Sequence, residues 1–243
     1  MEKIAVLIPC YNEKTTIKKV VTDFRTALPE ATVYVYDNRS SDGSKQIARQ
    51  AGAIVKTVHA RGKGNVLVHM LKDIEAECYL IVDADDTYPA EAAKRMVQCL
   101  KHADMVLGDR LTTTYFQENS RLFHSTGNRM VRFLVNQLFN ASYTDVMTGY
   151  RVISKGFADF LRNHLQSKEF EIETEICIWA AVQGKTVKSI PIRYKDRPKG
   201  SYSKLHTIRD GWKILKTILR YYIRYRKEDS YGYEKNIGKN LSK

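Results

Sequence analysis

The first half of the chain alternates short apolar runs with amphipathic segments. The apolar runs have the length of buried β-strands. The segments between them carry apolar residues at helical spacing, as Ile17, Val21, Phe24 and Leu28 do. Strictly alternating strands and helices are typical of a doubly wound, mostly parallel, Rossmann-like α/β sheet flanked by helices. The expected strands are 4–8, 32–36, 53–58, 78–82 and 105–107, and the expected helices are 17–28, 44–51, 61–74 and 89–100.

The alternation stops near residue 110. Residues 119–140 have a helical pattern, 169–182 predict a loop that leads into a helix, and 187–194 are strand-like. A further helix is expected at 207–227, with an apolar stripe that includes Trp212. We therefore divide the chain into an α/β domain (1–206), a basic amphipathic helix (207–227) and a flexible polar tail (228–243).

Polar residues follow each predicted strand at the point where it ends. The run from Tyr79 to Val82 leads directly into Asp83, Asp85 and Asp86. Open α/β sheets bind ligands at the carboxyl ends of their strands. Two carboxylates one residue apart can hold a hard divalent cation, which in turn binds phosphate oxygens. Taken alone, the pair fits an acidic surface loop equally well.

Glycines at 62 and 64 lie between a predicted strand and a predicted helix. The surrounding residues match neither the P-loop nor the dinucleotide-binding fingerprint. The glycines could allow a phosphate to approach the backbone at the start of the helix, or they could simply form a turn. Their spacing alone leaves both readings open.

Charge and cysteine content narrow the function classes. The formal net charge is +13, and residues 193–227 hold 12 Lys and Arg against two acids, Asp196 and Asp210. Such a patch favours polyanions, namely nucleic acid, an anionic membrane surface or phosphorylated substrates. The four cysteines are scattered without a CxxC pair, which argues against a zinc site or a disulfide framework. No signal peptide and no apolar run of about 20 residues is apparent, which predicts a cytoplasmic protein without a membrane span.

The order of the loop motifs resembles that of a known enzyme family. The first half carries P-x-Y-N-E at 9–13, D-N-x-S-x-D-G-S at 37–44, G-K-G at 62–64 and D-A-D at 83–85. In this it is similar to the GT-A glycosyltransferases of family 2. The second half carries G-x-R at 108–110, R-x-x-x-S at 121–125, D-x-x-T-G-Y-R at 145–151 and an R-x-x-G-x-x-S-K-L loop at 197–205. These motifs look like those of the dolichol-phosphate mannose synthase branch, which transfers a sugar from a nucleotide sugar to a polyprenyl phosphate.

The resemblance implies a role for each matching residue. It makes 1–206 a GT-A catalytic domain in which Asp83 and Asp85 hold Mg²⁺ or Mn²⁺ on the donor diphosphate. It implies that Arg110, Arg121 and Ser125 receive the acceptor phosphate and act with Asp85 as catalytic residues. It implies a mobile loop, with Arg197 and Lys204, that closes over the phosphates. The implied nucleotide-sugar site consists of Pro9, Tyr11, Glu13, Asp37, Lys63, Asp83, Ala84, Asp85, Arg197 and Lys204.

The sequence departs from the family pattern at two positions. Asn38 stands where the second acid of an Asp-Asp pair is usual, and Tyr202 adds one residue to the closing loop. The first departure favours a UDP-sugar over GDP-mannose as the donor.

The nature of the acceptor determines which catalytic groups are required. A phosphate monoester is largely dianionic at neutral pH, so it needs orientation more than deprotonation. Arginines can supply that orientation, and direct attack would invert the anomeric centre. A saccharide hydroxyl, in polysaccharide synthesis, would need a general base, for which Glu171 or Glu173 are the first candidates.

Two further hypotheses come from other functional classes. The basic segment could bind nucleic acid, but the acids at the strand ends and the lack of a nucleic-acid module argue against that partner. The chain could also be an inactive scaffold that regulates a partner, although Asp83 and Asp85 are both present.

The helix at 207–227 has two interpretations. Its apolar stripe and Lys/Arg-rich remainder fit an interfacial anchor on an anionic membrane, and they also fit a helix packed on the domain with solvated charges. An enzyme that acts on a lipid phosphate would lie on the inner face of the cell membrane. It would be attached there peripherally or through a membrane-protein partner.

Overall fold

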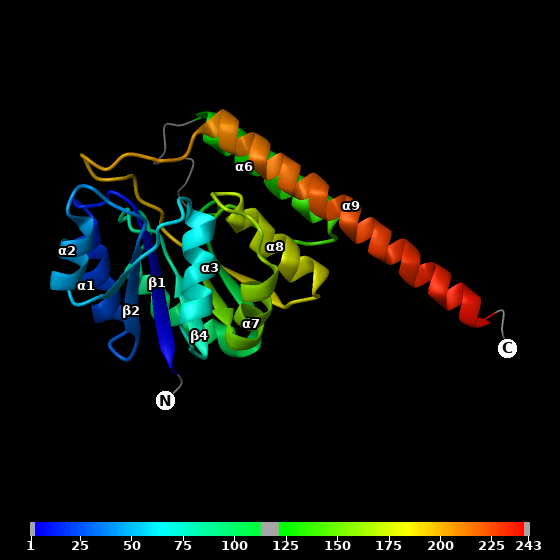
Figure 1. Ribbon diagram of the computed structural model, residues 1–243, viewed down its shortest axis with the longest axis horizontal. Coiled ribbons are helices and arrows are strands. Elements are labelled where there is room, and N and C mark those ends of the chain that lie inside the picture. Colours follow the sequence, from blue (N-terminus) through cyan, green and yellow to red (C-terminus); the bar gives the residue numbers. More distant parts are fainter. Residues whose placement is uncertain (1–2, 113–121, 241–243) are drawn as a thin grey trace.

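The structure is a computed structural model that describes residues 3–112 and 122–240. Within these residues one seven-stranded sheet has the order β3-β2-β1-β4-β6-β5-β7 (Figure 1). Neighbouring strands are parallel except around β6, which is antiparallel to β4 and to β5. The strands are β1 (Ile4–Cys10), β2 (Thr32–Asp37), β3 (Ile54–Thr57), β4 (Cys78–Ile81), β5 (Met105–Asp109), β6 (Arg151–Ser154) and β7 (Val187–Pro191).

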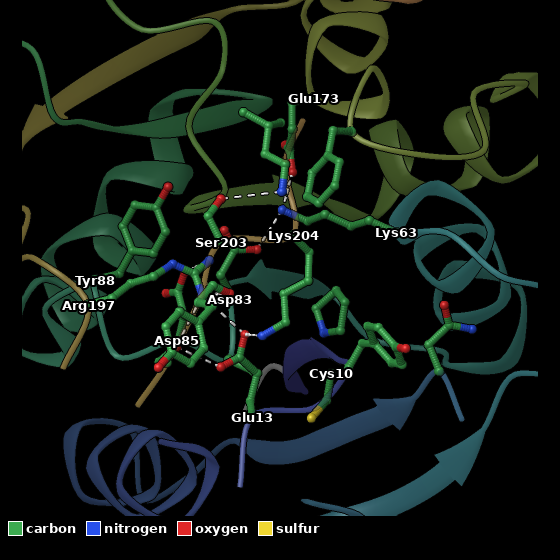
Figure 2. A pocket seen from close by; sticks show the side chains of 18 of the residues that line it. Cys10, Glu13, Lys63, Asp83, Asp85, Tyr88, Glu173, Arg197, Ser203 and Lys204 are labelled. Carbon is green, nitrogen blue, oxygen red and sulfur yellow. Dashed lines mark hydrogen bonds and ion pairs between the residues drawn. The ribbon is translucent and has the colours of Figure 1, made fainter. Parts of the chain in front are cut away.

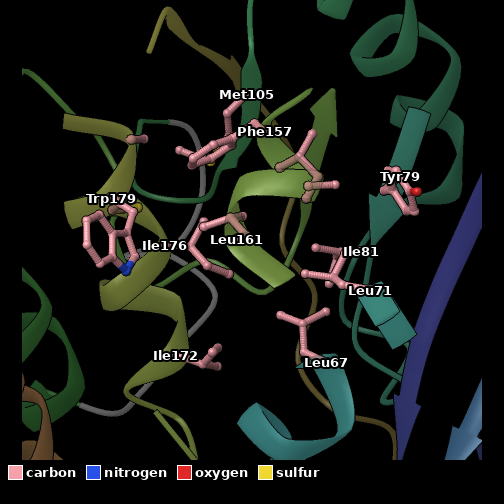
Figure 3. Packing of buried hydrophobic residues seen from close by; sticks show 14 of the residues in the cluster. Leu67, Leu71, Tyr79, Ile81, Met105, Phe157, Leu161, Ile172, Ile176 and Trp179 are labelled. Atoms are coloured by element: carbon pink, nitrogen blue, oxygen red, sulfur yellow. The ribbon is translucent and has the colours of Figure 1, made fainter. Parts of the chain in front are cut away.

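Helices cover both faces of the sheet and form two apolar cores. Helices α1, α2 and α4 contribute to the core on one face, and α3, α6, α7, α8 and α9 to the core on the other. Figure 3 shows part of this second core, where Leu67 of α3 and Leu161 of α7 lie close to Ile81 of β4. The helices are α1 (Ile17–Ala27), α2 (Ser44–Gln50), α3 (Lys63–Asp73), α4 (Ala93–Cys99), α6 (Leu122–Leu138), α7 (Lys155–His164), α8 (Ile172–Val182) and α9 (Thr207–Asn240).

The predicted α/β sheet is confirmed, with two local differences. Strand β1 continues through Pro9 to Cys10 instead of ending at Ile8. Proline is tolerated there because the pairing of β1 with β4 stops at Leu7, before the missing N–H would matter on that side. Strand β6 and helix α7 are not evident from the sequence pattern. Both are short, and β6 follows a loop that contains Gly149 and carries a charged residue, Arg151, in the middle of the sheet.

Helix α9 is both longer and more deeply packed than the sequence suggested. It runs to Asn240, so the expected end at Lys227 is wrong and the expected flexible tail has a helical backbone up to that residue. No proline interrupts this part of the chain, and its two glycines are tolerated at about 1 kcal/mol each. Figure 1 shows α9 beside α6, with its C-terminal end projecting past the rest of the molecule.

One face of α9 is buried, and another is exposed. Ile214, Ile218 and Tyr221 belong to the same core as α3 and α8, and Asp210 is fully buried, where it accepts a hydrogen bond from the backbone N–H of His206. In the part of the chain that the structure describes, no helix, α9 included, has a stretch apolar and long enough to span a bilayer.

Candidate active site

A pocket of about 1010 Å³ opens at the edge of the sheet where the parallel strands end. Residues after β1, β4, β5 and β7 reach it, together with the start of α3 and of α8. Because β6 is antiparallel, its first residues also lie at this edge. The pocket is lined by ten of the residues that the sequence analysis had selected: Pro9, Tyr11, Glu13, Lys63, Asp83, Ala84, Asp85, Arg110, Arg197 and Lys204.

Asp83 lies directly after β4 and forms an ion pair with Lys63, the first residue of α3 (Figure 2). Lys63 Nζ is 2.5 Å from Asp83 Oδ1 and 2.5 Å from Glu173 Oε1. Burial alone would lower the pKa of Lys63, but the two carboxylates raise it overall, so the ammonium group stays charged. Burial alone would likewise raise the pKa of Asp83, and Lys63 reverses this and lowers it.

Asp85 is more deeply buried than Asp83 and contacts the loop after β7. Its Oδ2 is 2.5 Å from Arg197, while its Oδ1 accepts a 2.6 Å hydrogen bond from the Thr87 hydroxyl. Burial raises the pKa of Asp85, and the nearby Asp83 charge raises it further, although Arg197 acts in the opposite direction. The two acids therefore have different environments although they are one residue apart.

The loop of residues 195–205 closes over Glu13 through three side chains. Lys204 Nζ is 2.5 Å from Glu13 Oε1, and Arg197 Nη1 is 3.2 Å from the same oxygen. The Ser201 hydroxyl donates to Glu13 Oε2 at 2.9 Å. Two cations of the loop thus lie on carboxylates of the pocket (Figure 2).

Arg110 is held rigidly at the end of β5. Its Nε and Nη2 donate to the two carboxylate oxygens of fully buried Asp145 at 2.7 and 2.9 Å. Its guanidinium carbon lies 5.3 Å from the centre of the Tyr194 ring. This forked pair fixes the plane of the guanidinium group, which is the requirement for binding an anion in a defined orientation.

Three predicted site residues are not placed in the pocket. Asp37 is buried outside it, and its Oδ2 accepts a hydrogen bond from the backbone N–H of Ser40. Arg121 lies outside the described residues. Ser125 lies within α6, but its side chain is not described.

Asn38, Gly62 and Gly64 shape the wall of the pocket. The Asn38 amide donates to the carbonyls of Val58 and Ala60, and its oxygen accepts from the Gly62 N–H. A Cβ on Gly62 or Gly64 would lie within 2.2 Å of a backbone carbonyl in 167–168. These glycines therefore allow the start of α3 to touch the segment of residues 167–168.

Several pocket residues were not predicted. Tyr88, Tyr194 and Asn128 line the pocket, and nothing in their local sequence distinguishes them from core residues. Asp145 belongs to the D-x-x-T-G-Y-R motif, but its role as the partner of Arg110 depends on two loops meeting across the sheet. The sequence marks Glu173 as a candidate base, whereas in the structure it contacts Lys63 and Arg151.

Gly149 leaves the space that the Asp83 carboxylate occupies. A Cβ at this position would lie 2.3 Å from Asp83 Oδ2. We expect Gly149→Ala to displace Asp83 and to lower the free energy of unfolding by about 1–3 kcal/mol. Gly156→Ala is the matched control, because a Cβ there meets nothing within 4 Å and alanine favours the helix by up to about 1 kcal/mol. Urea unfolding of both variants measures the difference, and equal stabilities would contradict the prediction.

The donor atoms of the pocket suit a hard cation that also has a bound substrate. No cluster of three or more His, Cys, Asp or Glu ligands occurs among the described residues. Magnesium usually needs only one or two carboxylates, with substrate phosphates and water completing its shell. Asp83 and Asp85 offer two such carboxylates in the pocket. Because Gly149 has no Cβ, there is space beside the Asp83 carboxylate.

Several known proteins are similar to this chain in sequence or in fold. Glycosyltransferase AglJ of Haloferax volcanii is 34% identical over 221 residues, which cover 90% of this chain and 72% of that protein. The dolichyl-phosphate hexose transferase of the same organism is 26% identical over 220 residues, covering 90% of this chain and 93% of that protein. Glucosyl-3-phosphoglycerate synthase from Mycobacterium tuberculosis, crystallised with Mn²⁺, UDP and glucosyl-3-phosphoglycerate, has a TM-score of 0.72 at 16% identity over 90% of this chain and 79% of that one.

The family model described as glycosyl transferase family 2 matches residues 5–161, which include β1 to β6 and every acid of the pocket except Glu169, Glu173 and Asp196. The expected GT-A fold is confirmed by the structural match. The chain therefore belongs to glycosyl transferase family 2, and it is a glycosyltransferase.

Proposed function

We propose that the protein transfers a hexose from a nucleotide diphosphate sugar, with inversion, to a polyprenyl phosphate. The named function of one relative, dolichyl-phosphate hexose transfer, supports a lipid phosphate as the acceptor. A UDP-sugar is the favoured donor because Asn38 replaces the second acid of the usual pair and is engaged in holding the 58–62 loop.

The pairing of the pocket carboxylates is the observation that carries the proposal. Among the described residues, Glu13, Asp83, Asp85 and Glu173 each contact a Lys or Arg side chain. In each of these carboxylates a cation already contacts an oxygen, which leaves the group poorly placed to act as the proton acceptor for a substrate hydroxyl. A saccharide hydroxyl would need such an acceptor, whereas a phosphate dianion does not.

The two base candidates for a saccharide acceptor are both engaged in the structure. Glu173 lies between Lys63 and Arg151. Glu171 accepts from the backbone N–H groups of Lys168 and Glu169 and does not line the pocket. Neither is placed to receive a proton from an acceptor in the pocket, which favours the lipid phosphate.

Asp83 and Asp85 would hold Mg²⁺ or Mn²⁺. When bound, such an ion stabilises negative charge on the departing nucleoside diphosphate, a contribution of several kcal/mol. Arg197 and Lys204 now contact Asp85 and Glu13, and both can instead reach phosphate oxygens once a donor binds. The 195–205 loop would then close over the donor and exclude water.

Arg110 would orient the attacking phosphate. Asp145 fixes its guanidinium plane at the rim of the same pocket. We assign Arg121 and Ser125 to the same acceptor site on the sequence motif alone. With the acceptor phosphate oriented by arginine, one of its oxygens would bond to the anomeric carbon as the bond to the nucleoside diphosphate breaks. Asp83 and Asp85 would hold the cation that offsets the charge of the departing diphosphate.

The exposed face of α9 supports peripheral attachment to a membrane. Ile208, Trp212, Leu219 and Ile223 are exposed and follow one another at spacings of four and seven residues, which place them on one stripe. This stripe is opposite the buried face with Ile214 and Tyr221. Exposed Arg209, Lys216, Arg220 and Arg224 lie along its flank. Such a helix lies in the bilayer interface and attracts anionic lipids.

We infer from this helix that the enzyme works at the inner face of the cell membrane, where nucleotide sugars are available. A membrane-protein partner could contribute to the same attachment, and nucleic acid is not an expected partner.

The test offers purified protein a panel of UDP- and GDP-sugars with a polyprenyl phosphate and Mg²⁺ or Mn²⁺. We expect a glycolipid from a UDP-sugar, and we expect EDTA to abolish its formation because the donor phosphates lose their counter-ion. Mass spectrometry of the extracted lipid identifies the product.

Each alternative predicts a distinct result in the same assay. Transfer to an oligosaccharide without polyprenyl phosphate would contradict the acceptor assignment. Full activity in EDTA would contradict the metal role, and a product formed only from GDP-mannose would contradict the donor preference.

A further inference from the structure

A chain of alternating charges runs from the pocket into the centre of the fold. Asp83 contacts Lys63, Lys63 contacts Glu173, and Glu173 contacts Arg151, each at 2.5 Å. Arg151 has no exposed surface, and the side chain of Glu173 is 6% exposed. Figure 2 shows Lys63 reaching between Asp83 and Glu173 from the start of α3.

The fold fixes Glu173 firmly. It lies in the first turn of α8, where the helix dipole favours a negative charge. Arg151 begins β6 and donates to the Glu173 carbonyl at 3.1 Å and to the Thr148 carbonyl at 2.5 Å. A buried arginine with two carbonyl partners and a carboxylate partner cannot move far, because leaving it unpaired is costly. Arg151 therefore anchors Glu173.

Lys63 differs from Arg197 and Lys204, two other cations of the pocket, in its second partner. Arg197 and Lys204 lie on the 195–205 loop and contact acids across the pocket. Lys63 shares its charge between one acid at the mouth of the pocket and one acid anchored behind it. If Asp83 were its only partner, Lys63 would compete with a metal ion for the Asp83 carboxylate.

We propose that Glu173 is a positioning residue that holds the Lys63 side chain in the pocket when a donor binds beside Asp83. This inference rests on the proposed function. Lys63 has three N–H donors, so one can stay on Glu173 while the others turn from Asp83 to a donor phosphate. Glu173 would thereby act through Lys63 on the affinity for the diphosphate and would not touch the substrate.

The experiment is a double-mutant cycle on UDP binding, measured by calorimetry with Mn²⁺ and without acceptor. We expect Glu173→Gln to weaken UDP binding about tenfold, as loss of a residue behind a ligand-binding group commonly does. Lys63→Met should also weaken it. If Glu173 acts through Lys63, Glu173→Gln in the Lys63→Met background should cause less than a twofold further loss.

The matched control is Glu171→Gln, which removes a negative charge at the start of the same helix without contact to Lys63. We expect it to change UDP affinity less than twofold. Equal tenfold losses for Glu173→Gln with and without Lys63 would overturn the proposal. An unchanged affinity in Glu173→Gln would overturn it as well.

The folding of the variants is controlled separately. Glu173→Gln leaves Arg151 buried without a charged partner, so its unfolding temperature is measured beside its UDP affinity. If the variant is not folded at 25 °C, the cycle is repeated with Arg151→Met in every member, which removes the unpaired charge. The same tenfold and twofold criteria then apply.

The outcome separates this inference from the proposed function. UDP binding needs no acceptor, so a failed lipid assay leaves the cycle intact. Absence of UDP binding by the unmodified chain would overturn the donor assignment and this inference with it. Intact binding without coupling between Glu173 and Lys63 would overturn only the role of Glu173.

Discussion

Replacing Asp85 by asparagine is expected to lower kcat/KM for sugar transfer by about three orders of magnitude. This corresponds to about 4 kcal/mol of lost transition-state stabilisation, in the range that metal-assisted departure of a leaving group supplies. Asparagine keeps the shape of Asp85 and can still accept the hydrogen bond from Thr87. It lacks the negative charge that a divalent cation requires.

The fold should survive this substitution. Burial and the nearby Asp83 charge raise the pKa of Asp85, so the folded state disfavours its ionised form and gains little stability from it. Initial rates over a range of donor concentrations, together with urea unfolding, measure both effects.

Asp86 provides the matched control for Asp85. Its carboxylate pairs with Lys19 of α1 at 2.9 Å, and it does not line the pocket. Its backbone has a φ of 59°, a conformation that asparagine adopts readily. Asp86→Asn should therefore leave kcat/KM within about twofold. A similar loss of kcat/KM in both variants would show that the effect comes from a disturbed loop conformation. The assignment of Asp85 as a metal ligand would then be wrong.

The double substitution Trp212→Glu with Leu219→Glu is expected to reduce binding to anionic vesicles by a factor of 100 or more. Trp212 is 62% exposed and Leu219 is 57% exposed, so neither change disturbs the core. Burying each side chain in a bilayer interface contributes about 1.5–3 kcal/mol, and a carboxylate in its place is repelled by anionic lipid. Vesicle flotation at several lipid concentrations gives the partition constant.

Two comparisons show whether any loss is specific to the stripe. Ile54→Glu removes an exposed apolar side chain of β3, which is 49% exposed and far from α9 in the chain, and it should bind vesicles as the unmodified protein does. Neutral vesicles should bind the unmodified protein more weakly, because they lack the negative charge that attracts the basic residues of α9. Undiminished binding of the double variant would show that α9 is not the membrane-binding element.

Much of the sheet could be predicted because its signals are local. Apolar runs such as Ile4 to Ile8 and Tyr79 to Val82 are buried on both faces, so their composition alone identifies them as strands. Strand β6 could not be identified in this way. Arg151 is buried there because Glu173, 22 residues away in the chain, contacts it through its carboxylate and its carbonyl. Such pairing over distance leaves no trace in a short window of sequence.

Most of the predicted residues that follow a strand line the pocket, whereas partners that come from several loops are not evident from the sequence. Asp83, Asp85 and Glu13 are placed in the pocket by the strand ends themselves. Asp37 also follows a strand, but its side chain turns back to hold its own loop. Whether an acid at such a position faces a ligand or its own backbone depends on turn geometry, which residue type does not determine.

The inward face of α9 belongs to one of the two apolar cores. Because Ile214, Ile218 and Tyr221 complete the core that also holds α3 and α8, α9 cannot be removed as a separable anchor. A chain shortened to residue 205 would expose that core and aggregate. Detergents that pull α9 away should inactivate the enzyme by loosening the same packing that supports Lys63 and Glu173. The enzyme would thus lose its catalytic geometry together with the membrane attachment proposed for α9.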